Sequence, residues 1–86
     1  INGKIVNLDY GLYTEPQLIE INNKAYIAIT DTQTSKVYVF DKDANLISGF
    51  PVYGNSQISL ANMDNRGKLE FCVKGEDNSV LIYQMN

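Results

Sequence analysis

The chain has no histidine, no tryptophan, one cysteine and one arginine among its 86 residues. Without histidine it cannot build a serine–histidine–aspartate triad or a cysteine–histidine pair, and a single cysteine allows neither an intrachain disulfide nor a cysteine-rich zinc cluster. The chain has seven basic residues, Arg66 and six scattered lysines, and ten acidic residues, which gives a net charge of −3. This balance argues against a surface that binds nucleic acid. These absences predict a protein that is not an enzyme and needs no cofactor.

Long apolar runs are also missing, since none approaches the roughly 18 residues that a membrane-spanning helix needs. No stretch repeats apolar residues at helical spacing over three turns, whereas several short runs alternate with period two. Valine, isoleucine, threonine, tyrosine and phenylalanine supply 28 residues, against four alanines, and asparagine supplies ten. This composition favours strands and turns over helices.

The alternating runs predict eight strands joined as antiparallel hairpins. Asn22 and Asn23 form a two-residue turn of the kind that accepts positive φ, and polar clusters at residues 31–35 and 75–78 predict further turns. The predicted strands are 4–8, 18–21, 25–30, 36–40, 46–48, 58–62, 69–74 and 80–84.

The two halves of the chain repeat each other. Aligning Gln17 with Gln57 places residues 18–22 over 58–62, and aligning Lys24 with Lys68 places Ala25, Ile27, Ala28 and Ile29 over Leu69, Phe71, Cys72 and Val73. A one-residue gap then brings 37–40 over 80–83. Before the first strand, Tyr10 lies over Phe50 and Tyr13 over Tyr53.

A repeat of about 40 to 44 residues with four short strands has the length of one β-propeller blade. The sequence therefore predicts an all-β fold of about two antiparallel four-stranded blades, at residues 15–54 and 55–86, with 1–13 as an additional outer strand. A small β-sandwich or barrel is the alternative. Strand 4–8 lacks a partner in its own blade, so we expect it to pair with 80–84, within the chain or between copies.

Two segments resemble known propeller repeats. Residues 37–47, followed by Gly49-Phe50-Pro51-Val52, resemble the third and fourth strands of a quinoprotein-like blade, in which a strand ends in an aromatic residue and aspartate and a polar loop follows. Residues 59–71 resemble the FG-GAP (integrin alpha) or VCBS type of repeat, with an aspartate and glycine loop between two strands. The resemblance implies a propeller and a secreted or periplasmic location.

Neither resemblance transfers a ligand site. The FG-GAP loop holds calcium on alternating acidic oxygens; Asn62 and Asp64 occupy the first two such places, but Arg66 occupies the third and would repel a cation. An Asx-type turn at Asp64 without calcium is expected. Residues 41–45 also alternate Asp and Asn oxygens, yet Leu46 stands where an EF-hand loop requires glycine, so a hairpin turn is predicted there.

The function expected from these features is that of a non-enzymatic scaffold that binds a protein or a small ligand. Tyr10, Tyr13 and Tyr53 recur near loops and are the candidate ligand-binding residues, although blade-to-blade packing also explains them. Two blades leave apolar outer faces, so we expect further blades of a longer chain, or other copies, to cover them. The alternative is a lectin-like protein that closes a ring by oligomerisation.

Overall fold

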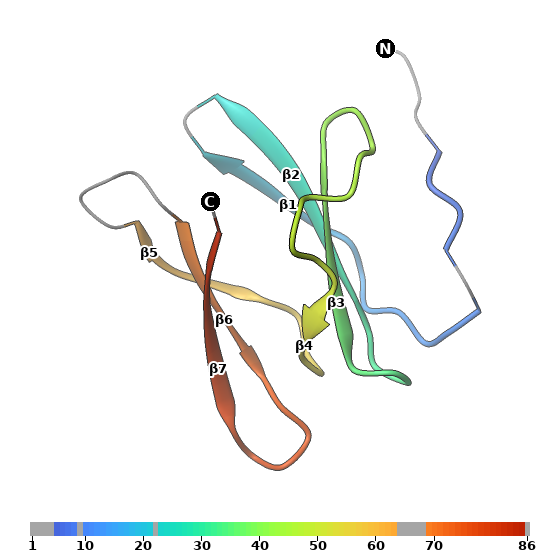
Figure 1. Ribbon diagram of the computed structural model, residues 1–86, viewed down its shortest axis with the longest axis vertical. Helices are drawn as coiled ribbons and strands as arrows, with labels where there is room; N and C mark the ends of the chain where they lie inside the picture. The colour runs from blue at the N-terminus through green and yellow to red at the C-terminus, as the bar shows by residue number, and fades with distance from the viewer. Residues whose placement is uncertain (1–4, 9, 22, 64–68, 86) are drawn as a thin grey trace.

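The computed structural model describes residues 5–8, 10–21, 23–63 and 69–85, and these residues form two antiparallel sheets without a helix (Figure 1). The predicted all-β class is therefore confirmed. Among the described residues no helix is long and apolar enough to cross a membrane. The first sheet has the order β1 (Gln17–Ile21), β2 (Lys24–Asp31), β3 (Lys36–Asp41), β4 (Val52–Tyr53), and the second β5 (Ser59–Met63), β6 (Leu69–Lys74), β7 (Val80–Met85).

Polar and small residues at positive φ make the tight turns between these strands. Asn23 (φ 65°) lies between β1 and β2, Ser35 (φ 58°) between β2 and β3, and Asn78 (φ 64°) between β6 and β7. Asparagine tolerates this left-handed region better than most residues. The predicted hairpins at these three places are confirmed by the antiparallel pairing of the flanking strands.

The fourth strand of the first sheet lies later than predicted. Residues 46–48 were expected to form it, but Leu46 makes only an isolated bridge to Phe40, and the paired strand is Val52–Tyr53. The chain turns away from β3 in between, because Gly49 takes φ 93° and the Phe50 amide donates to the Ile47 carbonyl at 3.1 Å. The expected strand is thus split into a bridge and a short β4.

The predicted N-terminal strand is wrong within a single chain. Residues 5–8 form no strand, and β7 pairs with β6 alone among the described residues. The N-terminal segment instead runs beside the first sheet, on the side away from the second sheet (Figure 1), and Val6 and Leu8 line a groove together with residues of β2 and β3. Pairing of this segment with β7 of another copy stays a prediction.

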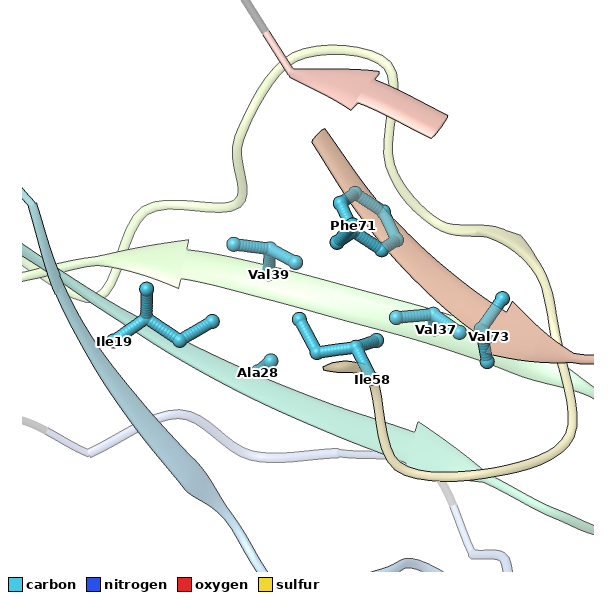
Figure 2. Packing of buried hydrophobic residues seen from close by; sticks show 7 residues of the cluster. All are labelled: Ile19, Ala28, Val37, Val39, Ile58, Phe71 and Val73. Carbon is cyan, nitrogen blue, oxygen red and sulfur yellow. The ribbon is translucent and has the colours of Figure 1, made fainter. Parts of the chain in front are cut away.

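Seven buried apolar residues fill the space between the two sheets, as Figure 2 shows. The first sheet contributes from β1, β2 and β3, and the second from β6 and the segment before β5. The members of this core are Ile19, Ala28, Val37, Val39, Ile58, Phe71 and Val73.

Gly54 lets the sheets approach closely at one end of this core. A methyl group at Gly54 would lie 2.7 Å from Cγ2 of Val37 and 2.8 Å from Cγ1 of Val73, so no larger residue fits without a shift. Polar contacts join the same interface: the Gln17 side chain donates to the Ile58 carbonyl at 2.9 Å and accepts from the Ile58 amide at 2.8 Å. The Thr30 hydroxyl donates to the Ser56 carbonyl at 2.8 Å.

The sheets stack front to back with respect to the sequence repeat. The face of the first sheet that carries Ile19, Ala28, Val37 and Val39 is called its front face. The front face of the second sheet is the one that carries the residues aligned with these four. Those aligned residues, in the same order, are Ser59, Cys72, Val80 and Ile82. The back face carries Leu18, Ile27, Ile29, Tyr38 and Phe40 in the first sheet, aligned with Ile58, Phe71, Val73, Leu81 and Tyr83 in the second.

Burial is inverted between the two halves on all three aligned strands. Ile19 is buried while Ser59 is exposed, and Leu18 is 63% exposed while Ile58 is buried. Val37 is fully buried, yet its counterpart Val80 is 71% exposed. The front face of the first sheet therefore packs on the back face of the second, which leaves one face of each sheet open.

Replacing Phe71 by alanine should lower the free energy of unfolding by about 3–5 kcal/mol, because the ring is fully buried and its loss leaves a cavity. Phe71→Leu should cost less, since it keeps most of the buried volume. Tyr10→Ala removes an aromatic side chain that is 93% exposed and should change stability by less than about 0.5 kcal/mol. Urea unfolding of the three variants measures this; equal losses for Phe71→Ala and Tyr10→Ala would contradict the core described here.

Candidate binding surfaces

Two hairpin turns and a linker meet at one end of the two sheets and are joined by a polar network. Asn55, in the β4–β5 linker, donates through Nδ2 to the Thr32 carbonyl at 2.9 Å and to Ser35 Oγ at 2.8 Å. The Ser35 hydroxyl donates in turn to Glu76 Oε1 at 2.6 Å. The network connects the β2–β3 turn to the β6–β7 turn, so it fixes the two sheets relative to each other.

Asp31 holds the segment before β1 against the end of β2. Its buried carboxylate accepts hydrogen bonds from the Leu12 amide (3.2 Å), the Gln33 amide (2.9 Å) and the Thr34 hydroxyl (2.8 Å). Gly11 passes so close that a methyl group there would lie 2.6 Å from Oδ2. Burial alone would raise the pKa of Asp31, but these hydrogen bonds outweigh it and lower the pKa below its usual value.

Asp31→Asn should therefore lower the melting temperature at pH 7, because an amide cannot accept all three hydrogen bonds and leaves donors unpaired. A carboxyl group whose pKa is lowered by folding stabilises the fold above its unfolded pKa of about 3.9, and that contribution is lost as the pH falls through the folded pKa. The difference in melting temperature between wild type and variant should thus shrink below about pH 4.

Thermal melts between pH 7 and pH 2.5 measure this dependence, with Asp43→Asn as a control of equal charge change at an exposed position. A melting temperature of Asp31→Asn equal to that of wild type at pH 7 would show that Asp31 does not anchor this segment.

The three candidate tyrosines lie at different places around this end of the molecule. Tyr10 is 93% exposed. Tyr13 bridges to Asp31, which pairs with Lys36, which pairs with Tyr53, so the two tyrosines stand in one row across the sheet. Three strand spacings separate them by about 14 Å. Tyr13 and Tyr53 could contact one extended ligand but do not line one small pocket.

Tyr53 also has a structural role, in line with the packing that the sequence offers as the alternative to ligand binding. Its hydroxyl accepts a hydrogen bond from the Glu76 amide at 3.1 Å, and its carbonyl accepts one from the Tyr83 hydroxyl at 2.9 Å. Both contacts tie β4 to the second sheet. Tyr10 is thus the most accessible aromatic ring of the three.

Of the two acidic loops noted in the sequence, the structure describes the one at residues 41–45 fully and the one that follows Asn62 only in part. Asp41 Oδ1 accepts hydrogen bonds from the amides of Asp43 and Asn45, both at 2.9 Å, which confirms the predicted hairpin turn. In the other loop, Asn62 pairs with Glu70 beside a register shift, whereas Asp64 and Arg66 lie outside the described residues. The expectation that this loop binds no calcium stays a prediction.

A groove of about 420 Å³ runs along the back face of the first sheet. Residues of the N-terminal segment form one wall, and β2 and β3 form the floor. A smaller hollow of about 210 Å³ continues it past Tyr38 and Leu46. The alternation of β2 predicts the floor, but only the apolar character of Val6 and Leu8 hints at the wall. The residues that line the groove are Val6, Leu8, Pro16, Ala25, Ile27, Ile29, Phe40, Asp41, Lys42 and Ala44.

Comparison with family models, with curated proteins and with solved structures finds no match to this chain. Its function is therefore inferred from its own residues.

Proposed function

We propose that the chain is a non-enzymatic, β-propeller-like scaffold that binds a protein segment or a small ligand at the end where its hairpin turns meet. The observation that supports this most is the front-to-back stacking of the two sheets. Blades repeated around an axis present one face to the preceding blade and the opposite face to the next. A duplicated sandwich with two-fold symmetry would instead bring equivalent faces together.

The contact that precedes each sheet supports the same relationship. The Thr14 amide donates to the Thr30 carbonyl at 2.8 Å before β1, and the Asn55 amide donates to the Lys74 carbonyl at 2.7 Å before β5. In both halves the incoming segment is therefore fastened to the end of the second strand of its sheet. This similarity favours two copies of one structural unit.

Tyr10 is the residue that we propose for ligand contact, since an aromatic ring left 93% exposed offers a flat face for stacking. The network of Ser35, Asn55 and Glu76 keeps the neighbouring turns in place. A rigid end with an exposed ring suits recognition of a peptide segment, and also of a sugar ring as in the lectin-like alternative.

Binding of the labelled chain to a peptide array and to a glycan array tests this proposal. Tyr10→Ala should weaken the bound signal about threefold to tenfold, the usual contribution of one aromatic contact. Glu20→Gln, at an exposed position of β1 near the opposite end of the sheet, is the control and should bind as wild type. Binding to glycans alone with the same dependence would select the lectin-like form. Absence of binding on both arrays, or equal binding by Tyr10→Ala, would overturn the proposal.

A further inference from the structure

Each sheet of the chain keeps one open face that carries apolar side chains, and on the second sheet these lie beside Ser59, Glu70, Lys74 and Gln84. On the back face of the first sheet, Ile27, Ile29 and Phe40 form the floor of the groove. On the front face of the second sheet, Val80 is 71% and Ile82 69% exposed. Exposed apolar side chains gathered on β7 and along the groove are candidate contact points for a partner.

The interface already present inside the chain indicates what fits these faces. There, Val37 and Val39 of a front face pack against Phe71 and Val73 of a back face. The open front face carries Val80 and Ile82 at the positions aligned with the two valines. The open back face carries Ile27 and Ile29 at the positions aligned with Phe71 and Val73. Part of the same interface, in the same register, is therefore available on each side, with Ser59 and Cys72 in place of Ile19 and Ala28 on the open front face.

We propose that a second copy of this chain docks head to tail, with the front face of its second sheet on the back face of the first sheet of its neighbour. The inference rests on the proposed propeller-like stacking and names the partner that continues it. Because the two surfaces in this contact differ, the contact is heterologous, and repeating it closes a ring if the rotation per copy allows.

The N-terminal segment has a place in this contact. In the first sheet, Leu46 forms a bridge to Phe40 at the outer edge. The alignment that places Tyr10 over Phe50 places Val6 over Leu46, and Phe40 lies over Tyr83. Residues 5–8 of one copy would accordingly leave the groove and pair with β7 of the next copy, beside Tyr83. The second sheet, which has three strands, would gain a fourth and lose an exposed edge.

Two single variants test the proposal, because each removes one of the two surfaces. Ile27→Glu places a charge on the open back face, and Ile82→Glu places one on the open front face. Sedimentation velocity of the wild type should show a mass above one chain that rises with concentration. Each variant alone should sediment as a single chain. Their equimolar mixture should form a two-chain species, since each variant retains the surface that the other has lost.

Other geometries give other results and would overturn the head-to-tail contact. If two back faces met, Ile82→Glu alone would still associate; if two front faces met, Ile27→Glu alone would. A wild type that stays a single chain at all concentrations would also overturn it. Gln33→Glu, with the same charge change in an exposed turn, should associate as wild type.

Circular dichroism and cooperative melting establish that each variant is folded before it is mixed. Ile29→Glu and Val80→Glu replace the two variants if either is unfolded, and the same pattern is expected. Failure of this inference is distinguishable from failure of the proposed function. A wild type that stays a single chain, but whose array binding depends on Tyr10, would contradict only the docking of a second copy. Association of the wild type without any array binding would contradict only the proposed ligand site.

Discussion

Phe71 lies fully buried between the two sheets, and the arrangement of the molecule depends on the contact that it makes there. Its ring stacks with the rings of Phe50 and Tyr83, at distances of 5.8 Å and 5.5 Å between ring centroids. These contacts link the β3–β4 connection and β7 to the core. The cluster of seven buried apolar residues is supplemented by polar contacts across the interface. The Gln17 and Ser35 contacts join the two sheets beside this core.

The contact between the two sheets is asymmetric, because it joins the front face of one sheet to the back face of the other. Equivalent residues of the two repeats meet different surroundings, so the interface that stabilises one chain also defines two surfaces that it leaves uncovered. On one of these surfaces Val80 and Ile82 are exposed, and on the other Val6 and Leu8 line the groove over Ile27, Ile29 and Phe40. The scaffold of repeated units that we propose would account for both surfaces, because in such a scaffold each front face packs on the back face of a neighbouring unit.

The sequence predicted the all-β class and the hairpins, because these depend on local alternation and on turn residues such as Asn23 and Asn78. It did not predict the position of β4, since Gly49 and Phe50 redirect the chain through contacts that period-two alternation does not contain. It also misplaced residues 5–8, because their alternation suits a strand but not a particular partner. The role of Asp31 was missed, as only the fold brings Gly11 and Leu12 to its carboxylate.

Contacts between methyl groups across the two sheets test the central claim of front-to-back packing most directly. Nuclear Overhauser effects on a methyl-labelled chain, at a concentration where it sediments as one species, should join Val37 to Val73. Both side chains border Gly54, and both belong to the buried core. The claim predicts these effects and none between Ile27 and Val73. Strong effects from Ile27 or Ile29 to Val73, without any from Val37, would mean that equivalent faces meet and would contradict it.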